Sequence, residues 1–294
     1  MGTEFTTLEK ALASDIGARG TILRQSVEFA DDLSERSRLI WSGGSYDRIA
    51  AGFRDEGVAF VERLELTPDL NVLDAACGSG NLTIPAARTG ARVTGFDIVS
   101  KLLDTAAMWS ARERLVVRYD EGTVEDMPYR NAEFDAVMSM FGVMFAARAD
   151  RVVSELARVT RPGGRVALAN WTPTGFVGQM LWKHIAYAPP PPGLSSPLLW
   201  GDESVVRERF SESHWDVSVT PRSLTFRYPF PPAGTADLFR CAYGPTVRAF
   251  QTLDKTVQAR FEADLVEHWA SHNKPGVENT AVDAEYLEVI AVRK

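Results

Sequence analysis

The stretch from Val72 to Asn81 constrains the fold of this chain more than any other segment. Its sequence, Val-Leu-Asp-Ala-Ala-Cys-Gly-Ser-Gly-Asn, predicts a buried strand, a glycine turn and the start of a helix. Gly78 and Gly80 carry no Cβ, so a ligand can approach the backbone closely at both positions. The amide groups at the start of the following helix would face that ligand.

An acidic residue follows at the end of the next expected strand. That strand, residues 91–97, ends in Asp97, which lies 23 positions after Asp74. In doubly wound sheets an acid at this place binds the hydroxyl groups of a ribose. The glycine turn and the acid together predict a site for a nucleoside.

Expected strands and helices alternate along most of the chain. This alternation predicts right-handed βαβ units and a parallel sheet with helices on both faces. A later segment, residues 172–210, breaks the rhythm with four consecutive prolines and several aromatic residues. The expected strands are 71–74, 91–97, 115–121, 134–140, 165–170, 220–228 and 286–292, and the main helices are 46–63, 100–114, 148–160, 234–252 and 257–272.

Charge and composition exclude several classes of partner. The formal net charge is −7, and no dense cluster of Lys and Arg indicates a nucleic-acid surface. No apolar run approaches the roughly 18 residues that a membrane span needs, and no signal peptide is visible. The two cysteines, Cys77 and Cys241, give no disulfide or metal framework. We therefore expect a cytoplasmic protein that acts on a small molecule, with neither a membrane nor a nucleic acid as partner, and leave the oligomeric state open.

The glycine pattern departs from the motif that binds dinucleotides. That motif needs a third glycine, and Thr83 stands in its place. The chain instead resembles the class I S-adenosylmethionine (SAM)-dependent methyltransferases, in particular the small-molecule branch that includes quinone-biosynthesis methyltransferases. The resemblance spans roughly residues 40–292. Besides the glycine turn and Asp97, it depends on Gly122, Phe134-Asp135, Phe141–Phe145, Arg161–Gly164 and Asn170–Pro173.

The resemblance implies a Rossmann-like α/β fold, and the residue patterns outside the alternating part predict a helical lid and a cap. The sheet would have seven strands, mostly parallel, with residues 286–292 as an antiparallel last strand inserted between its neighbours. Residues 1–45 would form an N-terminal helical lid, for which a permanently docked packing layer is the alternative. Residues 46–171 would form the SAM-binding core, 172–213 an inserted cap, and 214–294 the C-terminal part of the core with the last two strands and helices.

The resemblance also implies which residues contact the cofactor. Backbone around Ala76 and Gly78 would hold the methionine part of SAM, and Asp97 would bind the ribose. Relatives commonly carry Asp where this chain has Thr123, and that Asp accepts a hydrogen bond from the adenine amino group. The adenine contact here would fall mainly to the backbone amide of Val124. The full set of expected cofactor-binding residues is Tyr46, Asp74, Ala76, Gly78, Gly80, Asp97, Ile98, Thr123, Val124 and Met140.

Aromatic residues that follow the strands are candidates for a substrate pocket, because ligands bind at the carboxyl ends of parallel strands. Core packing is the alternative for each of them. His184 is either a packing residue or a base, so the catalytic residue stays open. His268 and His272 are four positions apart, but no third ligand accompanies them and we expect no metal. The expected pocket residues are Trp41, Phe141, Phe145, Trp171 and Tyr187.

The expected function is methyl transfer from SAM to a small, apolar or aromatic metabolite, as in secondary metabolite biosynthesis. Two alternatives keep the cofactor site and change the outcome. One is an enzyme that cyclises SAM itself and releases methylthioadenosine, and the other is a non-catalytic SAM-binding protein. The acceptor, and whether it is methylated on O, N or C, are not fixed by the sequence.

Overall fold

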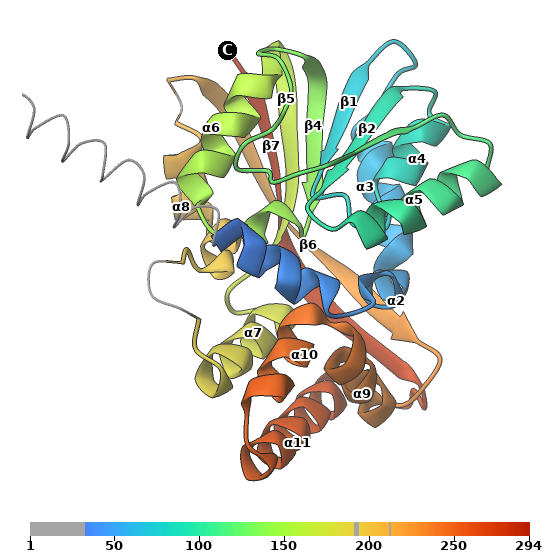
Figure 1. The fold of residues 1–294 in the computed structure, drawn as a ribbon, viewed down its shortest axis with the longest axis vertical. Helices are drawn as coiled ribbons and strands as arrows, with labels where there is room; N and C mark the ends of the chain where they lie inside the picture. Colours follow the sequence, from blue (N-terminus) through green and yellow to red (C-terminus); the bar gives the residue numbers. More distant parts are fainter. Residues whose placement is uncertain (1–32, 191–193, 212) are drawn as a thin grey trace, which may run out of the picture.

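A computed structural model describes residues 33–190, 194–211 and 213–294 of the chain. The helices expected between residues 7 and 32 lie outside the described residues. Residues 33–42 are helical and cross the front of the molecule, between the sheet and a layer of helices below it (Figure 1).

The described residues form a seven-stranded sheet with the order β3-β2-β1-β4-β5-β7-β6. The strands β1 to β5 pair in parallel, and β7 pairs antiparallel with both β5 and β6. The expected Rossmann-like fold with an inserted antiparallel last strand is therefore confirmed. The strands are β1 (Asn71–Ala75), β2 (Arg92–Asp97), β3 (Arg118–Glu121), β4 (Phe134–Met140), β5 (Thr160–Trp171), β6 (Trp215–Tyr228) and β7 (Thr280–Arg293).

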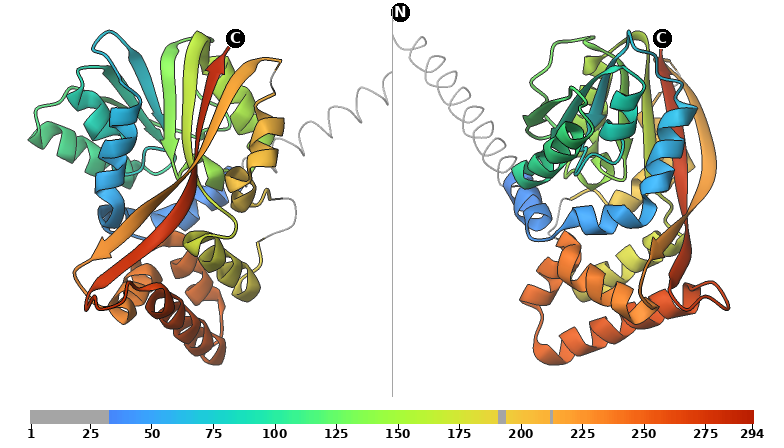
Figure 2. Two further views of the ribbon diagram at one scale, coloured as in Figure 1. Left: turned by 180° about the vertical axis from the view of Figure 1, so that it is seen from behind. Right: turned by 90° about the vertical axis from the view of Figure 1, so that its right-hand side faces the viewer.

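The last two strands form a ribbon that is longer than the rest of the sheet. Residues 286–292 of β7 pair with β5, whereas residues 280–285 pair with β6 beyond the end of β5. Pro221 lies within β6, which is possible because β6 is an edge strand and proline has no N–H to donate to a second neighbour. The ribbon runs past the sheet and along the lower helices (Figure 2).

Helices cover both faces of the sheet. α3 packs against α4, and α4 packs against α5. α6 lies on the face opposite α3 and α4 (Figures 1 and 2) and buries Val152, Leu156 and Val159, which recur at helical spacing. The elements of this part are α2 (Tyr46–Ala50), η1 (Ala51–Phe53), α3 (Arg54–Arg63), α4 (Thr83–Arg88), α5 (Ser100–Arg112), η2 (Val143–Phe145), α6 (Ala149–Val159), η3 (Pro197–Gly201) and α8 (Glu203–Arg209).

A second group of helices lies below the carboxyl ends of the parallel strands (Figure 1). It consists of α7 (Phe176–Tyr187), α9 (Pro232–Ala242), α10 (Gly244–Thr252) and α11 (Lys255–His272), and α11 packs against both α7 and α9. The single helix expected over residues 234–252 is in fact two helices. Pro245 at the start of α10 has no N–H to continue the hydrogen bonds of α9, so the chain turns at Tyr243.

Candidate active site

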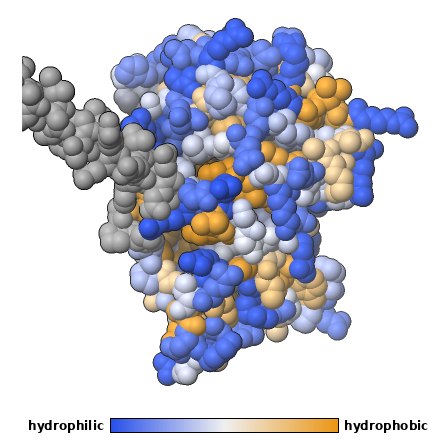
Figure 3. Space-filling model, in the orientation of Figure 1, coloured by the Kyte–Doolittle hydropathy of each residue, from blue (hydrophilic) through white to orange (hydrophobic). Residues whose placement is uncertain are grey.

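A cavity opens at the carboxyl ends of β1, β2 and β4, the place where doubly wound sheets bind ligands. Residues of helix 33–42 and of α2 close its other side. In the space-filling view, hydrophobic residues show near the middle of this face, where helix 33–42 crosses it (Figure 3). The residues expected from the sequence that line the cavity are Trp41, Tyr46, Asp74, Ala76, Gly78, Asp97, Ile98, Thr123, Val124, Met140, Phe141 and Phe145.

The glycine turn after β1 adopts a backbone that brings it close to this cavity. Ala76, Gly78 and Gly80 have φ values of 58°, 54° and 93°. Such a conformation costs a residue with a Cβ about 1–2 kcal/mol, so Ala76 stores local strain in the wall of the cavity. Gly142 packs against it, since a Cβ at position 142 would lie 2.6 Å from the Cβ of Ala76. The chain after β1 and the chain after β4 therefore pack closely against each other at Ala76 and Gly142.

Asp97 links the end of β2 to the glycine turn. Its Oδ2 accepts a hydrogen bond from the Gly78 amide at 2.8 Å, and its Oδ1 accepts one from the Val99 amide at 2.9 Å. The side chain is buried, and burial raises the pKa of Asp97 to about 6. The Ile98 amide also bonds to this carboxylate, and of its roughly four lone-pair sites at least one stays available. A ligand hydroxyl in the cavity can therefore donate to Asp97.

Asp74 explains why a threonine replaces the third glycine of the dinucleotide motif. The hydroxyl of Thr83 donates to Oδ2 of Asp74 at 2.5 Å, and both residues are buried. Burial raises the pKa of Asp74 to about 7, because the charged form loses its water. Thr83 thus partners a carboxylate that lines the cavity.

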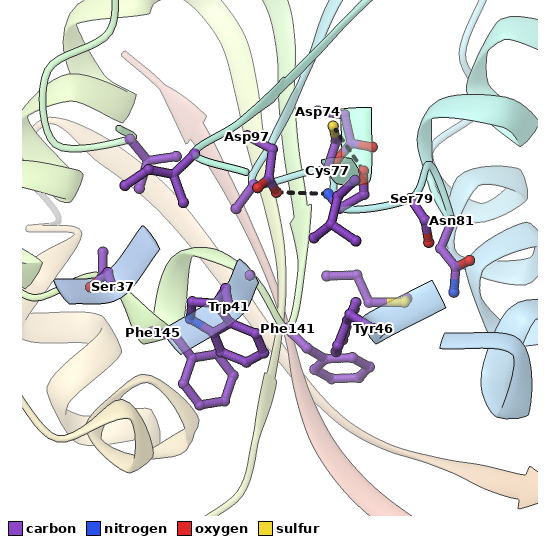
Figure 4. A pocket seen from close by; sticks show the side chains of 18 of the residues that line it. Ser37, Trp41, Tyr46, Asp74, Cys77, Ser79, Asn81, Asp97, Phe141 and Phe145 are labelled. Carbon is purple, nitrogen blue, oxygen red and sulfur yellow. Dashed lines mark hydrogen bonds between the residues drawn. The ribbon is translucent and has the colours of Figure 1, made fainter. Parts of the chain in front are cut away.

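Aromatic rings form the side of the cavity opposite these carboxylates. Figure 4 shows Trp41, Tyr46, Phe141 and Phe145 together, facing Asp74 and Asp97 across the cavity. Trp41 meets Phe145 and Tyr46 edge to face, with ring centroids 5.0 and 5.7 Å apart. Phe141 is stacked on Trp171 with centroids 3.5 Å apart. The cavity therefore has a polar end and an aromatic end.

Three expected site residues do not line the cavity. Gly80 shapes the turn from behind, where a Cβ would lie 3.3 Å from side-chain atoms of α4 and α5. Trp171 lies behind Phe141. Tyr187 lies in the lower helices, where its ring stacks on Phe261 and its hydroxyl donates to Asp264 at 2.6 Å.

His184 is likewise occupied elsewhere. Its Nδ1 donates to the Met180 carbonyl at 2.7 Å, so its Nε2 accepts from the Thr246 hydroxyl at 2.6 Å. Burial lowers the pKa of His184 to about 4. With both ring nitrogens bonded and no contact with the cavity, this histidine is a packing residue in the structure. Cys77 does line the cavity, and burial raises the pKa of its thiol, which disfavours the reactive thiolate.

Comparison with known proteins supports the same family as the geometry. Residues 73–168 match the family model described as Methyltransferase domain. An uncharacterized protein of Mycobacterium tuberculosis, Rv1403c, is 36% identical over 234 residues, which cover 78% of this chain and 85% of that protein. The demethylmenaquinone methyltransferase of Deinococcus radiodurans is 33% identical over 134 residues, 43% of this chain and 55% of that enzyme.

The fold itself has solved counterparts. The YcgJ protein from Bacillus subtilis superposes with a TM-score of 0.58 at 15% identity, covering 82% of this chain and 99% of that one. The family model covers both the glycine turn and Asp97. The chain belongs to the class I SAM-dependent methyltransferases. Its cofactor is SAM, and the residues present fit that group: Asp97 can accept from the ribose, and Gly78 leaves the turn open to it.

Several lining residues of this methyltransferase were not expected from its sequence. Ser34 and Ser37 reach the cavity from helix 33–42, on the same helix face as Trp41, and their spacing of three and four residues was the available signal. Asn81 donates from Nδ2 to the Ala50 carbonyl at 3.0 Å and so connects the glycine turn to α2. Phe53 lines the aromatic end, next to Phe141.

Glu125 also lines the cavity of the methyltransferase, at its polar end. This buried carboxylate accepts from the Arg148 backbone amide at 2.8 Å and from Arg148 Nε at 2.7 Å. Within the described ranges, no group of three or more His, Cys, Asp or Glu side chains is placed to hold a metal ion. None of the helices in this part of the chain is both long and apolar enough to span a membrane.

Proposed function

We propose that this methyltransferase acts on a small, apolar or aromatic acceptor that binds at the aromatic end of the cavity. The observation that carries the proposal is the separation of the two ends. The carboxylates Asp74, Asp97 and Glu125 lie at the cofactor end. The acceptor end is lined by aromatic rings, of which only Tyr46 bears a titratable group.

SAM supplies a methyl group on a positively charged sulfur, and a nucleophile in line with the C–S bond takes the methyl while the sulfur keeps the electron pair. The residues of the chain have two tasks in this reaction. Asp97 and the glycine turn fix the nucleoside, and the rings of Trp41 and Phe145 hold the acceptor and exclude water. The described rings around this end offer no carboxylate or imidazole, which suits an acceptor that loses its proton before the methyl group is transferred.

The aromatic end favours a flat acceptor, since rings stack on flat faces and meet edges in T-shaped pairs. One relative is named for methyl transfer to demethylmenaquinone, a quinone, and this agrees with the proposal. The proposal includes that the enzyme acts in solution and belongs to secondary metabolism. The sequence identity to that relative covers less than half of this chain, so the acceptor itself is left open.

The test is incubation with SAM, with and without a panel of phenols, quinones and aromatic amines. We expect S-adenosylhomocysteine (SAH) to form only when an acceptor is present. Methylthioadenosine formed from SAM alone would instead identify the cyclising alternative. Absence of any product with bound SAM would support a non-catalytic protein.

A pair of tryptophan variants tests the location of the acceptor. Trp41→Ala removes a ring from the cavity wall, whereas Trp182→Ala removes a ring that is 53% exposed on α7. We expect the first to raise the acceptor KM by about tenfold or more, because a ring contact of this kind is worth on the order of 1 kcal/mol beyond its buried area. The second should leave KM unchanged. Equal effects of the two variants would contradict the assigned acceptor end.

A further inference from the structure

A second hollow adjoins the cofactor cavity at its polar end. The two share five lining residues, and beyond that boundary the hollow continues between helix 33–42, the loop after β3 and α6. The shared residues are Ser34, Ile98, Gly122, Thr123 and Glu125.

The position of Asp97 fixes which part of the cofactor meets this boundary. Asp97 accepts from the Gly78 amide, so the ribose lies beside the glycine turn. The aromatic rings form a row from Phe145 and Trp41 to Phe141 and Tyr46, across the cavity from Asp97. The glycine turn follows β1, so the base extends away from it, toward Ile98 after β2 and Thr123 after β3. The edge of adenine farthest from its sugar carries the exocyclic amino group, and this edge therefore faces the second hollow.

Acidic side chains outnumber arginines among the described residues that line the hollow. The acids are Glu35, Glu121, Glu125, Asp126 and Glu155, and the arginines are Arg38, Arg148 and Arg151. Glu35 bonds to Arg38 at 2.6 Å, and Glu125 bonds to Arg148 at 2.7 Å. Glu155 bonds to Arg158 at 2.6 Å. Beyond these pairs, Glu121 and Asp126 add acidic side chains to a polar wall that has an excess of hydrogen-bond acceptors. A group that donates hydrogen bonds is the matching ligand chemistry.

We propose that this hollow is a subsite for a substituent on the exocyclic amino nitrogen of the cofactor's base. The enzyme accepts adenosyl cofactors that carry a small polar group with a hydrogen-bond donor, such as a hydroxyl, at this nitrogen. Thr123 favours this, because its side chain is short and borders both spaces. The inference rests on the binding of SAM in the first cavity.

Calorimetry on the full chain with two ligands tests the proposal. One is SAH, and the other is SAH with a 2-hydroxyethyl group on the exocyclic amino nitrogen. We expect the two dissociation constants to agree within about threefold, since the substituent would meet open polar space. A derivative that binds more than about thirtyfold more weakly than SAH would overturn the subsite, because a steric clash has that size. Failure of both ligands to bind would instead overturn the cofactor site.

A substitution in the far wall separates the subsite from the cofactor site. Ser154 on α6 lines the second hollow and not the first. We expect Ser154→Trp to weaken binding of the derivative by about tenfold or more and to leave SAH binding unchanged. Ser271→Trp, an equal change at an exposed serine of α11, is the matched control and should affect neither ligand. Equal weakening of both ligands by Ser154→Trp would also overturn the proposal.

Discussion

The carboxylate of Asp97 connects the proposed ribose site to the shape of the glycine turn, because one of its oxygens accepts from the Gly78 amide. Two roles therefore meet in one side chain. Its removal takes away a ligand acceptor and leaves a buried N–H without its partner, which costs about 1–3 kcal/mol of stability.

We predict that Asp97→Ala weakens SAM binding by about ten- to a hundredfold, the effect of losing a charged hydrogen-bond acceptor worth roughly 1.5–3 kcal/mol. Calorimetry measures the affinity for SAM. Thermal unfolding without cofactor measures how much stability the variant has lost. Unchanged SAM affinity in a folded variant would show that the ribose does not bind to Asp97.

Gly78 offers a second test with a matched partner. Both Gly78 and Gly163 have positive φ, at 54° and 73°, so valine strains the backbone at either position. A side chain at position 78 would point toward the Tyr46 ring and into the cavity, whereas nothing lies within 4 Å of a Cβ at position 163.

We predict that Gly78→Val abolishes cofactor binding while most of the fold remains. Gly163→Val should lose comparable stability and still bind SAM. Circular dichroism compares the folds, and equilibrium binding compares the sites. Normal binding by Gly78→Val would mean that the turn serves packing alone.

At the scale of elements, helix 33–42 is the part of the structure most directly placed to control access. Three of its residues line the cavity, and the linker after it is anchored to the lower helices. The Ser45 amide donates to the Ala242 carbonyl at 2.9 Å, and a Cβ on Gly44 would lie 2.1 Å from the same oxygen. We therefore expect any movement of helix 33–42 to pivot about Gly44 and Ser45, which are held against Ala242.

We predict that residues 33–46 gain protection from hydrogen exchange when SAM binds, because lids of this kind close over the cofactor and exclude water. Exchange measured with and without SAM gives the result directly. Deletion of residues 1–38 should then reduce turnover far more than the stability of the sheet. Equal protection in both states would identify a permanently docked layer.

The sequence predicted the elements whose residues repeat with a clear period. β4 begins and ends where expected, and the apolar strand 286–292 lies between β5 and β6 as its resemblance implied. The sequence did not predict the two helices α9 and α10, because apolar spacing continues across the break that Pro245 causes. Ser34, Ser37 and Glu125 were missed for a different reason. The helical spacing of Ser34 and Ser37 from Trp41 was a local signal, but that this helix face and Glu125 meet the cavity depends on tertiary packing.

At the scale of the whole molecule, two regions respond to pH in opposite directions. Burial raises the pKa of Asp74 to about 7 and that of Asp97 to about 6, so their contribution to stability is present at low pH and is lost as pH rises through these values. Burial lowers the pKa of His184 and His268 to about 4. Their contribution is present above the ordinary value of 6.5 and is lost as pH falls toward 4.

We predict that lowering the pH from 7 to 5 opens the lower helices before the cofactor site. For His184 the loss is on the order of 2 kcal/mol. Hydrogen exchange should rise in α7 and α11 while residues 74–80 stay protected. His184→Gln cannot take up a proton, so its α7 should show a smaller change. A uniform loss of protection across the chain would contradict the prediction.

The insertion of β7 between β5 and β6 has a consequence for the order in which the protein is made. The ribosome releases β6 before β7, yet among the described strands β6 pairs only with β7. Until β7 has emerged, β5 presents an open edge and β6 has no strand to pair with. Folding of this half must therefore follow synthesis of the final strand, and the nascent chain exposes an edge open to wrong pairing during that interval.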